Sequence, residues 1–331
     1  MEKSSLHPSF SSQFFLDKTM ETSSEEATSG STSELQSSTS GQPTSSSGGV
    51  SEHLDDPDFL SNYASLFNLR DLRSLRVTFR SATQASEVIP THLNTIIPQE
   101  AQDYILPNVN RAMLENLRLN VNPLSNNSIV KTFIHKLHQT VLNSVLQVGT
   151  SETFTDTLVA HLIFRTVNFD QWPMIVKLHP TLKFSVGRTT LSAVPEFVIN
   201  LHLNGKQYSV LIIEDKHLNN VTPTNDYGEP QIAAEIIACG DENIRQGRRI
   251  FDDMHIYAIR VVSTYVTFYH AKINKEYWQE LAVGCPQQQS ITITRYPGNN
   301  SDPINGFDLS TPNGRQNVIV ALCKLRELIT S

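Results

Sequence analysis

The sequence predicts an α/β fold in which helices flank a mixed sheet with a central antiparallel hairpin, and a helical extension precedes this core. Two observations support this prediction. Apolar residues recur at helical spacing over 129–148 and 153–167, and alternating runs follow at 175–186, 196–203 and 207–215. The chain has 331 residues, 39% of them hydrophobic, and can therefore bury one sizeable core.

The N-terminal part does not belong to that core. Residues 1–57 are rich in Ser and Thr and have too few apolar residues to offset the entropy of ordering, so we predict a disordered acidic tail. Residues 58–125 are predicted to form a helical accessory region interrupted by prolines, and residues 126–331 the main domain.

The remaining elements of the main domain follow the hairpin. A helix is expected from about residue 229, because Pro230 suits a first helical position. Strands are expected at 256–262 and 265–271, where apolar and polar residues alternate, and a final helix at 316–329.

Charge constrains the possible partners. The whole chain has a net charge of −7, but the residues up to Asp58 hold 2 basic and 10 acidic residues, which leaves 24 basic and 23 acidic residues beyond. A nucleic-acid partner would therefore need a local basic patch. Two arginine groups are candidates: Arg70, Arg73, Arg76 and Arg80 on one helix face, and Arg245, Arg248 and Arg249 after the helix that contains Gln231. The first group can equally well be an ordinary solvated helix face. The second can equally well complement the dipole at the end of its helix.

The most informative segment is an apolar strand that ends in Glu214, Asp215 and Lys216. Neighbouring residues on a strand point to opposite faces, so Glu214 and Lys216 share a face that Asp215 does not. These charges need partners or a ligand, because burying them unpaired would cost several kcal/mol.

The position of Glu196 depends on the turn at Asn204-Gly205. A strict two-residue turn would place Glu196 on the face of Asp215 and mix charged with apolar side chains on both faces. A three-residue loop with a bulge at Gly205 places Glu196 beside Glu214 and Lys216. We predict the second register because it leaves a uniformly apolar opposite face, made of Phe197, Ile199, Leu201, Leu203, Leu211 and Ile213.

Two converging carboxylates repel each other unless one is protonated or a dication lies between them. Oxygen ligands favour Mg²⁺ or Mn²⁺. A lysine two residues after Glu214 can orient a water or stabilise charge on a phosphate. The residues therefore predict metal-assisted hydrolysis of a phosphodiester.

Pro195-Glu196, the hairpin and Glu214-Asp215-Lys216 resemble the signature of the PD-(D/E)xK, restriction-endonuclease-like nuclease superfamily. The resemblance implies a core of helix, three strands, helix and strand over residues 151–272. It also implies that Glu196 and Glu214 bind the metal ion, that Lys216 is the catalytic lysine and that the substrate is nucleic acid, with DNA as the default. The first acid of this family is usually Asp, which is one methylene shorter than Glu196.

Three further polar residues match the family pattern more loosely. Gln231 and Glu235 lie one turn apart on the helix after the hairpin, where relatives place a polar face beside the active centre. Glu152 resembles an acid that the first core helix contributes to the metal shell. The alternatives are a solvated helix start for Gln231 and Glu235 and a helix-dipole role for Glu152.

Two other functions remain open from the sequence. The same fold could serve as a non-catalytic nucleic-acid or protein interaction module, or Lys216 could be a purely structural ion-pair partner of the two acids. Three scattered cysteines and the lack of an apolar leader or of any run of eighteen apolar residues predict an intracellular protein, nuclear or cytoplasmic, that does not span a membrane.

Overall fold

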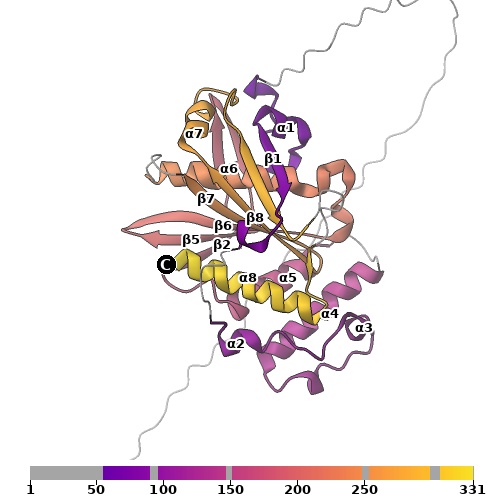
Figure 1. The fold of residues 1–331 in the computed structure, drawn as a ribbon. Coiled ribbons are helices and arrows are strands. Elements are labelled where there is room, and N and C mark those ends of the chain that lie inside the picture. Colours follow the sequence, from indigo (N-terminus) through magenta and orange to yellow (C-terminus); the bar gives the residue numbers. More distant parts are fainter. Residues whose placement is uncertain (1–54, 90–95, 147–150, 248–252, 299–305, 331) are drawn as a thin grey trace, which may run out of the picture. The chain divides into compact units, whose positions relative to one another are not determined.

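A computed structural model describes residues 55–89, 96–146, 151–247, 253–298 and 306–330. Within these residues the chain has an α/β fold with a mixed sheet and helices on both of its faces, as the sequence predicts (Figure 1). The predicted tail at 1–57 lies outside the described residues, apart from residues 55–57.

The main sheet has the strand order β1-β9-β8-β7-β6-β5-β2, and β10 pairs with β8. The β6–β7 and β1–β9 pairs are parallel, and the other pairs are antiparallel. A separate hairpin is formed by β3 and β4. The strands are β1 (Val77–Ser81), β2 (Met174–Leu178), β3 (Leu182–Val186), β4 (Thr189–Ala193), β5 (Phe197–Leu203), β6 (Lys206–Lys216), β7 (Met254–Val262), β8 (Tyr265–Ile273), β9 (Ile291–Tyr296) and β10 (Phe307–Asp308).

Helices cover the two faces of this sheet. They are α1 (Leu69–Ser74), α2 (Gln99–Gln102), α3 (Arg111–Leu114), α4 (Ser128–Leu146), α5 (Thr153–His161), α6 (Glu229–Arg245), α7 (Lys275–Leu281) and α8 (Pro312–Thr330). A π-helical turn, Leu162–Thr166, continues α5. Figure 1 shows α6 on one side of the sheet and α4, α5 and α8 on the other.

Each face of the sheet has its own apolar core. Ile213 and Phe197 pack with α4, α5 and α8, whereas Ile212 and Val198 pack with α6, α7 and the β3–β4 hairpin. Because both faces are buried, β6 is apolar at every position from Val210 to Ile213. The charged end of β6 therefore lies at the end of a buried strand.

The β5–β6 hairpin differs from the predicted register in one respect. Leu203 pairs with Lys206 across a two-residue turn in which Asn204 and Gly205 have φ values of 51° and 74°. Asn-Gly favours this turn, because both positions need positive φ. The predicted bulge at Gly205 is therefore wrong. A bulge lies instead in β6: Ile199 pairs with Leu211 and Asn200 with Ser209, so Val210 is the extra residue and the register shifts by one.

This bulge places Glu196 beside Glu214, which is the arrangement that the sequence predicted from a three-residue loop. Phe197 pairs with Ile213, so Glu196 and Glu214 become neighbours on the α6 face of the sheet. On the opposite face Phe197, Ile199, Leu211 and Ile213 are buried and Leu201 packs against them, as predicted, but Leu203 is exposed.

Three predictions of secondary structure need correction. Within 58–125, residues 77–81 form a strand that pairs with β9, because Val77 and Phe79 alternate with polar residues and pack on the α6-side core. The predicted strand at 175–186 is two strands, β2 and β3, which lie in different sheets. The four-arginine helix face is also wrong: α1 ends at Ser74, Arg76 has a φ of 51°, and Arg80 lies in β1 and pairs with Glu87 at 2.6 Å.

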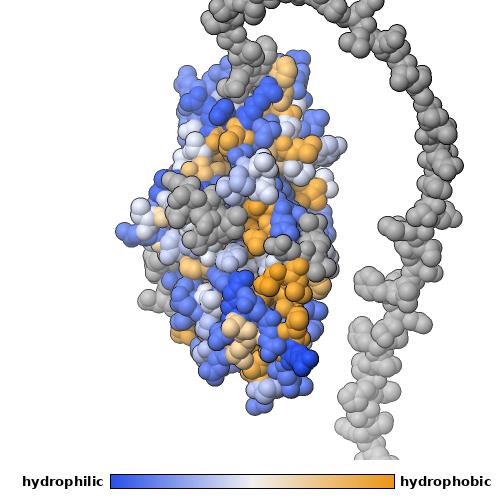
Figure 2. Space-filling view, turned by 90° about the vertical axis from the view of Figure 1, so that its right-hand side faces the viewer, coloured by the Kyte–Doolittle hydropathy of each residue, from blue (hydrophilic) through white to orange (hydrophobic). Residues whose placement is uncertain are grey.

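Hydrophilic residues cover most of the face seen in Figure 2, where hydrophobic residues gather mainly in the lower half. Among the described residues, no helix combines the length and the apolar character that crossing a bilayer would require. The three cysteines, which are free, are all buried.

Candidate functional site

The C-terminal end of β6 carries the two central residues of the site. The side chain of Glu214 is only 2% exposed, and its Oε1 lies 2.5 Å from Nζ of Lys216. The Lys216 side chain is 21% exposed, so the pair reaches from the sheet interior to the surface. The strand alternation predicted from the sequence therefore brings this acid and this lysine together.

Glu196 joins them from the residue that precedes β5. Its backbone N–H donates to Oε2 of Glu214 at 3.4 Å, and its own carboxylate accepts from Nδ1 of His179 at 2.9 Å. The register shift caused by the bulge produces this approach. His179, from the loop between β2 and β3, had no sequence signal, since a lone histidine in a loop resembles many others.

Helix α6 supplies the amide and a further acid. Its second residue is Pro230, and Gln231 lies in its first turn, directly over the end of β6. Nε2 of Gln231 donates to Glu214 at 2.6 Å and to Oε1 of Glu235 at 2.8 Å. Gln231 thus bridges two carboxylates, which fixes their positions. Gln231 and Glu235 therefore lie one turn apart on the same face of α6, as predicted.

Glu152, which precedes the first turn of α5, closes the site from the other side. Its Oε2 is 4.0 Å from Nζ of Lys216, and its Oε1 accepts from the side-chain amide of Asn220 at 2.8 Å. Glu152 makes no side-chain hydrogen bond to the helix that follows, so it does not cap that helix through its side chain. Its position before the first turn remains compatible with the helix-dipole role. The structure thus brings together all of the residues that we call the Glu214 cluster: Glu152, Glu196, Glu214, Lys216, Gln231 and Glu235.

Burial and mutual repulsion control the charges of this cluster. Burial above all, with a contribution from Glu196, raises the pKa of Glu214 to about 7, although Lys216 opposes the shift. Burial also raises the pKa values of Glu196 and, more strongly, of Glu235. Burial alone would lower the pKa of Lys216, but its contacts with Glu214 and the charges of Glu152 and Glu235 raise it above its ordinary value.

Asp215 lies on the opposite face of β6 and is fully buried. Burial, followed by the charge of Asp156 on α5 and a side-chain hydrogen bond with it, raises the pKa of Asp215 to about 10. Asp215 is therefore protonated at neutral pH, a feature that the alternation of the strand did not reveal.

The cluster has more acids than cations. Four carboxyl groups surround Lys216, and Oε2 of Glu235 is buried with no hydrogen-bond partner among the described residues. The raised pKa values of these acids keep protons on part of the cluster at neutral pH. Carboxylate oxygens are the donors that Mg²⁺ and Mn²⁺ prefer, and a dication would take the place of those protons, so the residues fit such an ion chemically. Among the described residues, however, no three His, Cys, Asp or Glu side chains are already arranged to ligate one.

The second arginine group is only partly described. Arg245, in the last turn of α6, lies 3.3 Å from Asp241 and donates to the backbone carbonyl of Lys183. These are contacts that stabilise the end of the helix. Arg248 and Arg249 lie outside the described residues.

Comparison with models of known protein families and with curated protein sequences gave no match.

Proposed function

We propose that the Glu214 cluster hydrolyses phosphodiester bonds of nucleic acid, with DNA as the substrate and Mg²⁺ or Mn²⁺ as the cofactor. One observation carries this proposal: Glu196, Glu214 and Lys216 meet at the end of two adjacent antiparallel strands, where buried acids outnumber cations. These crowded, buried acids keep protons that they would lose in water, and such raised pKa values are typical of functional sites.

The order of elements supports a PD-(D/E)xK-like core. Helix α5 is followed by β2, β5 and β6, which pair consecutively as an antiparallel meander, and then by α6 and β7, which is parallel to β6. This is the helix, three strands, helix and strand that the sequence resemblance implies, with the β3–β4 hairpin inserted. The parallel β6–β7 pair is connected through α6, which delivers Gln231 to the end of β6.

Each residue of the cluster has a role in this proposal. Glu196 and Glu214 would supply oxygen ligands, and Glu152, on the exposed side of Lys216, a further one. Gln231 would hold Glu214 in place through its 2.6 Å hydrogen bond. Lys216 would hold the attacking water and stabilise the charge on the phosphate. A bound dication would lower the pKa of that water and neutralise charge on the substrate.

The test is metal titration with both polymers. Full-length protein is incubated with supercoiled plasmid and with labelled single-stranded RNA, over a series of Mg²⁺ and Mn²⁺ concentrations and with EDTA. We expect metal-dependent nicking of DNA that falls at least ~100-fold in Lys216→Ala. Lys206→Ala is the matched control, because Lys206 lies at the exposed opposite end of β6 and contacts only the carbonyl of Gly247 among the described residues; it should retain activity.

Two results would reject the proposal. One is the absence of metal-dependent cleavage of either polymer by a folded wild-type protein. The other is equal cleavage by wild type and Lys216→Ala, which would trace the activity to a contaminating nuclease. Circular dichroism spectra of both variants establish that a loss of cleavage is not a loss of folding.

A second candidate function is a non-catalytic interaction module on the same fold. It is favoured by the way in which Lys216 and Gln231 both engage Oε1 of Glu214, while His179 engages Glu196. These contacts occupy oxygens that a dication would need. The module would bind nucleic acid without cleaving it and without a requirement for metal, which the same titration distinguishes.

A further inference from the structure

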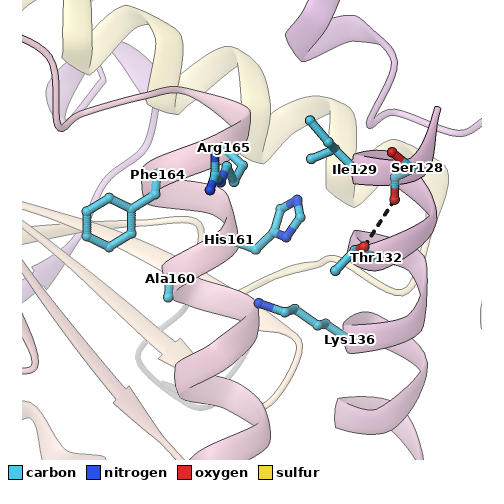
Figure 3. A pocket seen from close by; sticks show the side chains of 8 residues that line it. All are labelled: Ser128, Ile129, Thr132, Lys136, Ala160, His161, Phe164 and Arg165. Carbon is cyan, nitrogen blue, oxygen red and sulfur yellow. Dashed lines mark hydrogen bonds between the residues drawn. The ribbon is translucent and has the colours of Figure 1, made fainter. Parts of the chain in front are cut away.

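A separate hollow lies between α4 and the end of α5. Its volume is about 560 Å³, and its polar lining comprises Ser128, Thr132, Lys136, His161 and Arg165. Figure 3 shows Lys136 extending from α4 toward α5, and His161 pointing from α5 toward α4. None of these residues belongs to the Glu214 cluster.

The hollow is cationic, and none of the described residues that line it is acidic. Within the part of the chain that the structure describes, neither Lys136 nor Arg165 forms an ion pair with a carboxylate. Nζ of Lys136 donates to the carbonyl of Thr157 at 3.0 Å, which leaves two of its three N–H groups for other partners. Burial, followed by the charge of Arg165, lowers the pKa of Lys136, as expected where two cations converge.

His161 provides an independent indication of a missing partner. It is 4% exposed, and its Nε2 has no hydrogen-bond partner among the described residues. Its ring packs against Tyr104 and Phe133, with centroid distances of 5.7 Å to each, so the imidazole is held in place. Burial, with the charges of Lys136 and Arg165, lowers its pKa to about 4, so the ring is neutral at physiological pH.

One helix terminus at the hollow also favours an anion. Helix α4 begins at Ser128, on the rim, so the positive end of its dipole faces the same region. On the other side, the chain of α5 widens into the π-helical turn that carries Arg165, and such turns often occur at functional sites. Two helices therefore present positive charge to one cavity.

We propose that this hollow binds a phosphate group of the nucleic-acid backbone, away from the bond that is cleaved. The assignment to nucleic acid rests on the proposed function. Helix α5 links the two sites, because Glu152 precedes its first turn and His161 ends it. Nine residues of helix span about 13 Å, which is about four base-pair rises of a duplex. A polymer of phosphates could therefore occupy both sites at once.

The test measures binding without cleavage. Fluorescence anisotropy of a labelled DNA duplex is recorded with full-length protein in EDTA, over a series of salt concentrations. Arg165→Gln is the main variant, because Arg165 is exposed and its loss should leave the fold intact. Lys136→Gln is the second variant. Lys131→Gln is the matched control, since Lys131 lies on α4 about 140° away from Lys136 and does not line the hollow.

We expect Arg165→Gln and Lys136→Gln each to weaken binding for every duplex sequence, and to reduce the slope of log K against log salt by about one. Lys131→Gln should bind within about twofold of wild type. Equal losses in all three variants, or no loss in any, would overturn the proposal.

A second arm distinguishes the source of the phosphate. Thermal unfolding is followed with inorganic phosphate, against chloride at equal ionic strength. A phosphate-induced rise in Tm that Arg165→Gln abolishes, combined with unchanged DNA binding, would reject the nucleic-acid source in favour of a small phosphate compound. The variants could weaken DNA binding as expected while the wild-type protein cleaves nothing in Mg²⁺. This result would support phosphate binding by the hollow and reject hydrolysis by the Glu214 cluster.

Discussion

Helix α6 carries two buried acids that the protein treats in opposite ways. Glu229, at its start, is contacted through both carboxylate oxygens by Nη1 of Arg295 at 2.6 Å and accepts a further hydrogen bond from Tyr269. Glu235, six residues later, shares the amide of Gln231, and its other oxygen is buried with no hydrogen-bond partner in the part of the chain that the structure describes. The first acid is neutralised by a cation within the fold, whereas burial raises the pKa of the second, so that it keeps a proton instead.

This difference separates a structural use of buried charge from a functional one. A carboxylate with a buried guanidinium partner is satisfied without any ligand. The Glu214 cluster instead collects Glu152, Glu196 and Glu235 around a single lysine, and it does so where Lys216 and Glu152 reach the surface. Its raised carboxyl pKa values are what the proposed dication would reverse, because a bound cation favours the ionised carboxylates.

Breaking the structural pair should have the largest effect on stability. Arg295→Ala leaves Glu229 buried with no guanidinium, so we expect the free energy of unfolding to fall by about 3–5 kcal/mol. Urea unfolding followed by circular dichroism measures this loss. A loss below ~1 kcal/mol would mean that Glu229 is satisfied by other groups.

Replacing the buried acid Asp215 by an amide should raise the free energy of unfolding instead of lowering it. The pKa of Asp215 rises from 3.8 to about 10 on folding, so folding takes up a proton over that range and stability falls as the pH rises through it. We therefore expect Asp215→Asn to stabilise the protein by a few kcal/mol at pH 8. Unfolding in urea at pH 5 and pH 8 provides the test, and a gain that is the same at both pH values would contradict the assignment.

The pH dependence of cleavage should report on Glu214. Its pKa is raised to about 7, so below that pH it carries a proton and lacks the charge of a metal ligand. We expect the rate of DNA cleavage to fall about tenfold for each pH unit below this value. A higher Mg²⁺ concentration should move the midpoint to lower pH, because the dication competes with the proton. A midpoint that does not respond to Mg²⁺ would count against Glu214 as a ligand.

The smallest effect is expected from an exposed ion pair. Lys272 and Asp253 lie 2.7 Å apart, but their side chains are 58% and 42% exposed. Water screens such a pair, so Lys272→Ala should change the free energy of unfolding by less than ~1 kcal/mol. If this variant lost as much stability as Arg295→Ala, burial would not be what distinguishes the pairs.

The sequence predicted which residues come together around Glu214 better than it predicted the strands and turns that surround them. Strand alternation and the family resemblance were enough to bring Glu196, Glu214 and Lys216 to one face, because a one-residue register error would bury charge. The location of the bulge was missed, since Val210 carries no local signal for one, whereas Asn204-Gly205 carries a clear signal for a turn. Strand β1 was also missed, because a parallel partner that lies more than 200 residues away leaves no mark on a local pattern.

Residues that depend on three-dimensional packing could not be found in this way. His179 contacts Glu196 only because the loop after β2 returns to the start of β5. The cationic hollow likewise joins Lys136 to Arg165, which are 29 positions apart, through the packing of two helices. Helical periodicity predicted α4 and α5 but not which of their polar residues would face each other.

Isothermal titration calorimetry with Mn²⁺ addresses whether the Glu214 cluster is a dication site or a closed ion-pair network. We expect saturable binding by wild type that is lost in Glu214→Gln and in Glu196→Gln. It should persist in Lys272→Ala, in which an exposed pair far from the cluster's contacts is removed. Binding that is absent from a folded wild-type protein at millimolar Mn²⁺, or that survives in Glu214→Gln, would contradict the assignment of this cluster as a metal-dependent centre.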